Sequence, residues 1–350
     1  MCYLGGVFME LICTIGPRAK NVDDIKSYIE NGMTIPRFNF SHADYDKFDL
    51  FLKELRALNN IRYIMQDLQG NKLRVSKKFK GEYKVSRGAK IAFCLEKDFE
   101  SLYLKKVNQI LVPICYDGSF DDFKNVKYIF MKDATMKFKV LRFKEDFIST
   151  VTIHGGILRA EKGINAPNLN RSNLKLTAKD KKDIEWGITR GINMISLSYT
   201  SKADDVKEVR SFINEMRRKY QIKDKIKLYS KIECREGYDN FEDILKLSDG
   251  IILGRGDLKG EVNITEIPII DETIIKRMKR SKKNLFIATY LLENMSKFST
   301  PSLGEIDDIY RFINSKVNGL ILCTELAISR RPEKIIRTLK DYINLYSIRE

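Results

Sequence analysis

The stretch from Lys227 to Asp257, "KLYSKIECREGYDNFEDILKLSDGIILGRGD", decides the fold class. It contains two short apolar runs of strand-favouring residues, 227–233 and 250–257, and each run ends in charged residues. Runs of nearly continuous apolar character are typical of parallel strands that are buried on both faces. The stretch therefore predicts two consecutive parallel strands whose polar ends lie at the same edge of a sheet.

The same pattern recurs along the rest of the chain. Eight such runs occur in total, at 11–16, 33–40, 62–67, 194–199, 227–233, 250–257, 284–289 and 319–325. Amphipathic segments with helical spacing lie between most of them, for example at 21–32, 177–192 and 202–220. Eight strands that alternate with helices predict an α/β fold, specifically a (β/α)8 TIM barrel.

One interval, between Val75 and about Pro167, breaks this rhythm. Its segments alternate apolar and polar residues with a period of two, as in "GEYKVSRGAKIAFCL" (81–95) and "VKYIFMKDATMKFKVLRF" (126–143). This pattern predicts an antiparallel β-barrel domain at 75–167, inserted after the third strand between barrel segments 1–74 and 168–350. Such an insertion emerges at the carboxyl ends of the barrel strands, where active sites of this fold lie, and we expect it to act as a lid.

Composition narrows the classes of partner. The formal charge is +16, from 63 basic and 47 acidic residues, which suits a nucleic-acid binder, a membrane-surface protein or an enzyme of anionic substrates. The basic residues are spread along the chain without a stripe of interleaved aromatic residues, so we expect no nucleic-acid partner. No apolar run reaches about 20 residues, so we expect no membrane span. Six cysteines without a CxxC motif predict reduced thiols and a cytoplasmic location.

Charged residues gather where the predicted strands end. Lys231 and Glu233 are two residues apart in a strand and so face the same side, the barrel mouth. On spacing alone, a structural ion pair and a catalytic pair are equally open. Glu233 and Asp257 end consecutive strands, and two carboxylates so placed suit Mg²⁺, which completes its coordination shell with water and substrate oxygens. A glycine-rich turn capped by Asp257 is the simpler alternative.

A third cluster lies in "PRFNFSH" (36–42). Arg37, Asn39 and Ser41 alternate onto one face at a predicted strand end, and arginine is the preferred bidentate partner of phosphate. The alternative is a polar strand end that closes the barrel.

These blocks together resemble the signature blocks of the pyruvate kinase family. The blocks occur in the family's order: "CTIGP" (13–17), "RFNFSH" (37–42), "KG.N.P" (162–167), "SKIE..EG" (230–237), "SDGI" (248–251), "GRGDL" (254–258) and "IAT..LE.M" (287–295). The resemblance extends from Cys13 to the last strand at Glu325. It implies a barrel with a mobile β lid that transfers the phosphoryl group of phosphoenolpyruvate to ADP.

The resemblance also implies roles for individual residues. Lys231, Arg37 and Arg74 would contact phosphoryl oxygens, and Thr289 would lie beside the enolate. The amides of Gly256 and Asp257 would receive the substrate carboxylate. Glu233 and Asp257 would bind Mg²⁺, with Mn²⁺ as an alternative metal. The residues on the nucleotide side would be Thr14, Pro17, His42 and Lys162, together with the lid carboxylate Asp133.

The turn "QDLQGNKLRV" (66–75) indicates whether a monovalent cation is required in addition to Mg²⁺. In the family this turn usually reads D-T-K-G-P-E-I-R-T, and its Asp belongs with Asn39 and Ser41 to a potassium site. Here Asp67 and Arg74 match, whereas Leu68, Gln69, Lys72 and Val75 replace Thr, Lys, Glu and Thr. This set resembles the branch of the family that works without a monovalent cation. It implies that the Lys72 ammonium supplies the missing charge and that K⁺ is not required.

Some positions depart from the family pattern. Lys259 follows "GDL", Cys323 stands in a block that usually reads S-G-E-T, and residues 298–305 keep little of the pattern through which family members pair between subunits. A homo-oligomer is therefore left open, and the length predicts a chain without the regulatory C-terminal domain. Two alternatives to the family reaction are a specialised enzyme acting on phosphoenolpyruvate or another 2-oxo acid, and an inactive ligand-sensing homologue on the same scaffold.

Overall fold

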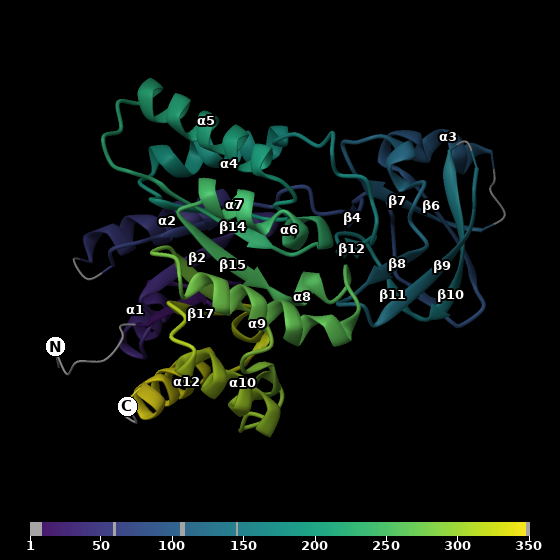
Figure 1. Ribbon diagram of the computed structural model, residues 1–350. Helices are drawn as coiled ribbons and strands as arrows, with labels where there is room; N and C mark the ends of the chain where they lie inside the picture. The colour runs from purple at the N-terminus through teal and green to yellow at the C-terminus, as the bar shows by residue number, and fades with distance from the viewer. Residues whose placement is uncertain (1–8, 59–60, 106–108, 145, 348–350) are drawn as a thin grey trace.

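The computed structural model describes residues 9–58, 61–105, 109–144 and 146–347, and its centre is a closed barrel of eight parallel strands (Figure 1). The strands in barrel order are β1 (Glu10–Thr14), β2 (Ile35–Asn39), β3 (Met65–Asp67), β13 (Met194–Leu197), β14 (Lys227–Ile232), β15 (Gly250–Gly254), β16 (Asn284–Ala288) and β17 (Gly319–Leu322). All eight predicted strands are present, which confirms the (β/α)8 barrel.

The strands are buried on both faces. Inward-facing side chains form a small core inside the barrel, where the rings of Tyr229 and Phe286 stack with centroids 4.9 Å apart. Outward-facing residues such as Leu11, Phe38 and Leu253 join a larger core beneath the helices. Burial on both faces explains the continuous apolar runs, because neither side of a strand contacts water.

Helices cover the outside of the barrel (Figure 1). They are α1 (Val22–Glu30), α2 (Tyr45–Ala57), α4 (Ala178–Thr189), α5 (Ala203–Lys219), α6 (Arg235–Asp239), α7 (Phe241–Leu247), α8 (Arg255–Leu258), α9 (Ile267–Met278), α10 (Leu303–Asn314), α11 (Thr324–Ile328) and α12 (Pro332–Ser347). None of these described helices is long and apolar enough to cross a membrane.

A second sheet is inserted between β3 and β13. Its seven strands in spatial order are β12 (Ile164–Asn165), β8 (Tyr128–Met131), β9 (Met136–Phe143), β10 (Phe147–His154), β6 (Lys90–Leu95), β7 (Ile110–Cys115) and β4 (Arg74–Val75). The short pair β5 (Tyr83–Val85) and β11 (Gly156–Leu158) and the helix α3 (Phe99–Leu104) complete the insertion. It has its own apolar core, which includes Phe93, Phe123 and Phe138. The pairing is antiparallel as predicted, except that β6 and β7 run parallel.

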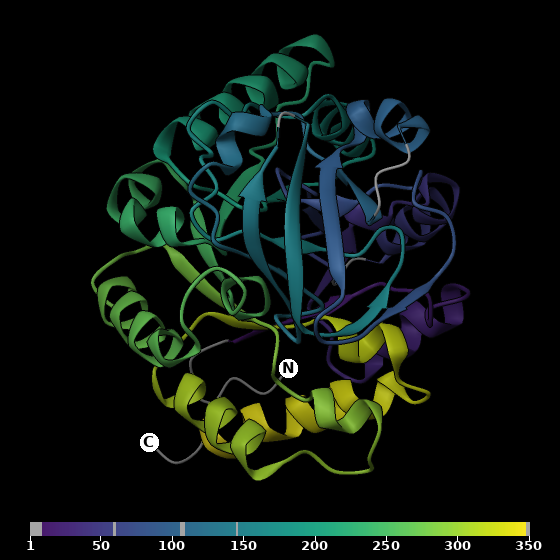
Figure 2. The ribbon, with the colours of Figure 1, turned by 90° about the vertical axis from the view of Figure 1, so that its right-hand side faces the viewer.

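The insertion stands at the carboxyl ends of the barrel strands. In Figure 1 the arrow of β15 points toward it, and in Figure 2 its strands lie in front of the barrel. The predicted position after the third strand is therefore correct, and the barrel mouth faces this second sheet.

Two of the predicted strands end earlier than expected, and a short helical turn follows each of them. The strand predicted at 250–257 ends at Gly254, and Asp257 lies in the helical turn α8 that follows. The predicted alternation of Arg37, Asn39 and Ser41 ends at Asn39, because Ser41 lies in a short 3₁₀ turn, Phe40–His42. The second turn is capped by the Asn39 side chain, which a strand pattern does not encode.

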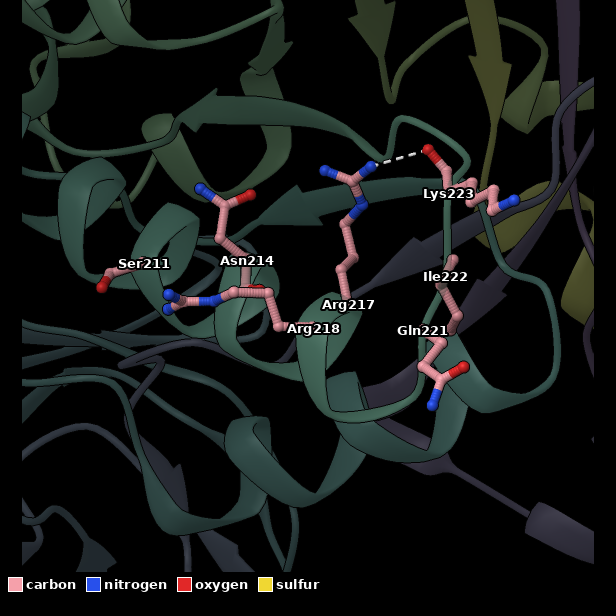
Figure 3. A pocket seen from close by; sticks show the side chains of 7 residues that line it. All are labelled: Ser211, Asn214, Arg217, Arg218, Gln221, Ile222 and Lys223. Carbon is pink, nitrogen blue, oxygen red and sulfur yellow. Dashed lines mark hydrogen bonds between the residues drawn. The ribbon is translucent and has the colours of Figure 1, made fainter.

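The five cysteines within the described residues are free thiols, as predicted, and Cys2 lies outside those residues. A pocket of about 690 Å³ lies where α5 leads into β14, at the amino-terminal end of that strand and so on the opposite side of the barrel from its mouth (Figure 3). Its cations are Arg217, Arg218 and Lys223.

Candidate active site

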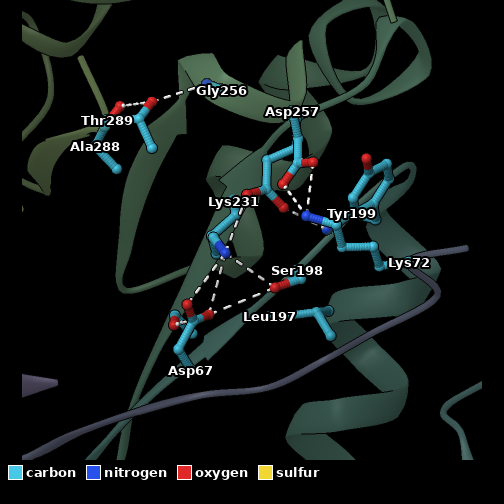
Figure 4. A network of polar contacts seen from close by, with 12 residues as sticks. Asp67, Lys72, Leu197, Ser198, Tyr199, Lys231, Gly256, Asp257, Ala288 and Thr289 are labelled. Carbon is cyan, nitrogen blue, oxygen red and sulfur yellow. Dashed lines mark hydrogen bonds and ion pairs between the residues drawn. The ribbon is translucent and has the colours of Figure 1, made fainter. Parts of the chain in front are cut away.

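The buried carboxylate of Asp67, at the end of β3, is the centre of a polar network at the barrel mouth (Figure 4). It accepts hydrogen bonds from Arg37 Nε at 2.9 Å, Lys231 Nζ at 3.2 Å and Ser196 Oγ at 2.8 Å. Burial alone would raise the pKa of Asp67, but Lys231 and Arg37 outweigh it and lower the pKa to about 2. Asp67 is therefore a fixed negative charge between two cations.

Lys231 joins this network to the end of β14. Besides Asp67, its ammonium group contacts Ser198 Oγ at 3.0 Å and Glu233 Oε1 at 3.0 Å. Burial would lower the pKa of Lys231, but the carboxylates of Asp67 and Glu233 raise it above the usual value for lysine. Lys231 and Glu233 thus lie together at the mouth of the barrel, as the two-residue spacing predicted, and the ammonium group stays charged.

The Glu233 carboxylate is held in place by a backbone amide as well as by Lys231. Its Oε2 accepts a hydrogen bond at 3.0 Å from the amide of Tyr199, whose φ of 52° turns the chain sharply after β13. A Cβ at Gly254 would lie 2.6 Å from Glu233 Cγ, so only glycine leaves room for this side chain. Burial raises the pKa of Glu233, and the neighbouring Asp257 carboxylate adds to the rise against the effect of Lys231.

Asp257 is paired with a cation from the other side of the site. Lys72 Nζ lies 2.7 Å from each of its carboxylate oxygens (Figure 4). Burial would raise the pKa of Asp257, but Lys72 outweighs it and the pKa is lowered. No hydrogen bond or ion pair within the described part of the chain joins Lys72 to Asp67. Lys72, which stands where the family usually has glutamate, thus forms an ion pair with Asp257, one of the two predicted metal ligands.

Arg37 and Thr14 come from the neighbouring strands β2 and β1. Arg37 donates to Thr14 Oγ1, and Thr14 Oγ1 donates to the carbonyl of Leu322 at 2.7 Å. A weaker contact joins Arg37 to Cys323 Sγ at 3.8 Å. Burial would lower the pKa of Arg37, but Asp67 raises it, so the guanidinium stays charged. These contacts orient its cationic end within the mouth.

Thr289 closes the site at the end of β16. Its hydroxyl accepts a hydrogen bond from the Gly256 amide at 2.8 Å and donates to the Ala288 carbonyl at 2.5 Å (Figure 4). Thr289 and Tyr290 have φ values of 70° and 56°, which are unusual for residues other than glycine. Arg255 supports this turn by donating to the Thr289 carbonyl at 2.6 Å. The amide predicted to receive the substrate carboxylate therefore lies beside the predicted enolate residue.

Comparison with known proteins identifies the family. The model of the pyruvate kinase barrel domain matches residues 8–336. The chain belongs to the pyruvate kinase family. It is 27% identical over 336 residues to a pyruvate kinase of Bacillus licheniformis, a match that covers 94% of this chain and 55% of that protein. It is 29% identical over 334 residues to a pyruvate kinase of Clostridium perfringens, with 94% and 68% covered. The chain thus spans little more than half the length of the Bacillus relative.

Three residues predicted for the nucleotide side, His42, Lys162 and Asp133, have charged neighbours from the insertion or the turn that leads into it. Arg74 donates to the Glu161 carbonyl at 2.9 Å, next to Lys162. Burial lowers the pKa of His42, and Arg74 adds to the effect. Asp133 lies on a turn with a φ of 52°, and burial of its carboxyl group raises its pKa, with a further rise from the Asp257 carboxylate. The Asp133 carboxylate therefore lies within electrostatic reach of Asp257 at the mouth.

Pro17, Asn39 and Ser41 are not part of the hydrogen-bonded network around Asp67 within the described residues. Pro17 is exposed in the loop after β1. Asn39 Oδ1 instead accepts the Ser41 amide at 3.0 Å, which caps the 3₁₀ turn after β2. Of the three residues predicted to share a face, only Arg37 reaches the centre.

Sequence reasoning missed the residues that hold the insertion against the mouth. Asn165 Nδ2 donates to Tyr199 Oη at 2.7 Å and to the Asp257 carbonyl at 3.2 Å. Buried Glu261 accepts from Asn165 at 3.3 Å and from Arg171 at 3.1 Å. The signal available in the sequence was weak: Asn165 stands in the "KG.N.P" block, but its partners are 34 to 96 residues away.

The carboxylates fit the divalent cation that the family implies. Asp257 and Glu233 supply hard oxygen ligands and are close enough for Asp257 to raise the pKa of Glu233. No group of three or more His, Cys, Asp or Glu side chains placed to hold a metal occurs among the described residues. Mg²⁺ typically takes only one or two protein carboxylates, so two are sufficient.

Glu325 is a fully buried carboxyl group beside this site. It accepts the Cys323 amide at 2.9 Å through Oε1, whereas its Oε2 has no hydrogen-bond partner among the described residues. Burial raises the pKa of Glu325 from 4.5 to about 7, against the effect of two backbone hydrogen bonds. Because the folded chain holds this proton more tightly than the unfolded chain, the contribution of Glu325 to stability is most favourable below pH 4.5 and falls as the pH rises to about 7.

We expect Glu325→Gln to remove this pH dependence. At pH 4 the variant and the wild type should unfold with similar free energies, because the wild-type carboxyl is then largely protonated in both the folded and the unfolded chain. At pH 8 the variant should be more stable by about 3 kcal/mol, since the amide does not ionise. Chemical denaturation at both pH values measures the difference. If the free energies of unfolding of the wild type and Glu325→Gln differed by the same amount at both pH values, Glu325 would not titrate in this range.

Proposed function

We propose that this chain transfers the phosphoryl group of phosphoenolpyruvate to ADP, giving pyruvate and ATP, with Mg²⁺ and without K⁺. The observation that carries the proposal is the buried ammonium of Lys231, held 3.0 to 3.2 Å from the carboxylates of Glu233 and Asp67 at the carboxyl ends of the strands. Membership of the pyruvate kinase family supports the same reaction.

The chemistry needs positioning and positive charge more than covalent help from the protein. Lys231 and Arg37 would place two cations against the phosphoryl oxygens, and their raised pKa values keep them charged throughout the working pH range. Arg74 would add a third cation from the edge of the insertion. Glu233 and Asp257 would hold Mg²⁺, which would supply further positive charge to the same oxygens.

The substrate end that bears the carboxylate would lie against α8. The Gly256 amide hydrogen bonds to the Thr289 hydroxyl, so a carboxylate entering here would exchange that contact for its own. The Thr289 hydroxyl would then lie beside the enolate carbon that takes up a proton. The insertion, held by Asn165 against the Asp257 carbonyl, would keep water from the phosphoryl group.

A coupled assay of pyruvate formation from phosphoenolpyruvate, ADP and Mg²⁺ tests the proposal. We expect turnover by the wild type. If the wild type binds phosphoenolpyruvate but forms no pyruvate, the chain is an inactive homologue or uses another acceptor or 2-oxo acid, and the proposal is wrong.

In the same assay, Asp257→Asn should raise the half-saturating Mg²⁺ concentration by on the order of tenfold or more, because an amide oxygen carries no formal charge for the metal. Asp243→Asn is the matched control, since Asp243 makes an exposed ion pair with Lys246 far from the mouth. An unchanged Mg²⁺ requirement in Asp257→Asn would exclude Asp257 as a ligand.

A further inference from the structure

A second pocket, of about 530 Å³, lies outside the barrel mouth and is strongly basic. Its walls come from the β1–α1 loop, the segment after η5 (Glu293–Ser296) and the start of α12. Five cations line it: Arg18, Lys297, Arg330, Arg331 and Lys334. No acidic side chain lines it, since Glu333 of the same helical turn is not part of the wall. The volume is in the range of small-molecule sites.

The charge of this pocket is not neutralised within the described part of the chain. None of the five cations forms an ion pair there, and two of them contact only backbone carbonyls. Arg18 donates to the Ile328 carbonyl at 3.2 Å, and Lys334 donates to the Ser299 carbonyl at 3.0 Å. Elsewhere, basic residues such as Arg171 and Arg255 are paired with carboxylates. Uncompensated like charges that converge on a concave surface favour an anionic ligand.

Two further features of the pocket indicate what kind of ligand it would bind. The 16-residue helix α12 begins at the pocket with Pro332, so the positive end of its dipole adds to the cationic field. The apolar side chains of Phe298 and Ile328, 63% and 50% exposed, stand among the cations. Five cations exceed what one phosphate group requires, whereas several phosphates on one molecule would engage them together.

We propose that this pocket binds a small molecule that carries two or more phosphate groups. The ligand would be held by Arg330, Arg331 and Lys334 at the start of α12 and by Arg18 and Lys297 from the facing loops. The pocket lies on the mouth face of the barrel, after the carboxyl ends of β1, β16 and β17, but none of its lining residues belongs to the network around Asp67 and Lys231.

Isothermal titration calorimetry with inorganic tripolyphosphate and with inorganic phosphate tests this proposal. The pocket variant is Arg330→Gln/Arg331→Gln, and the matched control is Arg218→Gln/Lys223→Gln in the basic pocket beside α5 (Figure 3). All four replaced side chains are exposed, and each double substitution removes two positive charges. The two variants should therefore be equally stable and differ only in which pocket has lost charge.

We expect the wild type and the control to bind tripolyphosphate equally at this site and the pocket variant to bind it about tenfold more weakly or worse. Inorganic phosphate should bind more weakly than tripolyphosphate by a similar factor. Equal losses in both variants would show nonspecific attraction and overturn the proposal, as would no loss in the pocket variant or no binding by the wild type. Equal binding of both anions would exclude a ligand with several phosphates.

Discussion

Replacing Lys231 with methionine is expected to lower kcat for phosphoryl transfer by on the order of a thousandfold. Lys231 carries the buried positive charge that contacts both Asp67 and Glu233, and methionine keeps its length without the charge. Without it, three carboxylates, including Asp257, would face the negatively charged phosphoryl group with fewer cations between them. The coupled assay of pyruvate formation measures the loss.

The same substitution should also destabilise the chain, so a second variant is needed to separate folding from catalysis. Methionine leaves the buried Glu233 carboxylate without its partner ammonium, at an expected cost of about 3 to 5 kcal/mol. Lys231→Met/Glu233→Gln removes both charges and should regain much of the stability without regaining activity. Turnover near the wild-type level in either variant would exclude Lys231 from the reaction.

Local sequence patterns were sufficient for the barrel and for part of its site. Each strand is short, apolar and buried on both faces, so its pattern depends on its own residues. The two-residue spacing also places Lys231 and Glu233 together, and their side chains are 3.0 Å apart. Spacing left open whether this is a structural or a catalytic pair. The structure shows an ion pair that also includes Asp67, and its catalytic use stays a prediction.

Contacts across the barrel and between its two parts could not be derived from local patterns. Lys72 and Asp257 are 185 residues apart, and their pairing depends on how β3, β15 and the insertion are arranged in space. The hydrogen bond from the Tyr199 amide to the Glu233 carboxylate comes from a residue with a positive φ, which tyrosine rarely adopts. The Asn165–Glu261–Arg171 contacts likewise join distant segments, and each residue alone resembles an ordinary polar loop residue.

Lys72 gives the most specific prediction about cations. Its ammonium lies 2.7 Å from both Asp257 oxygens and provides a fixed positive charge where the family usually has glutamate. We therefore expect the wild type to be equally active in K⁺ buffer and in tetraalkylammonium buffer of equal ionic strength. Strong stimulation by K⁺ would show that Lys72 does not replace the ion.

Lys72→Met should have two opposite effects in the tetraalkylammonium buffer. The value of kcat should fall by on the order of a hundredfold, because a charge near the phosphoryl group is lost. The half-saturating Mg²⁺ concentration should fall severalfold, because Asp257 no longer shares its oxygens with an ammonium group. Lys72→Arg, which keeps the charge, is the control and should retain much of the wild-type turnover. If kcat of Lys72→Met fell while the Mg²⁺ requirement rose, Lys72 would not compete with the metal for Asp257, and the ion pair would instead position that carboxylate for it.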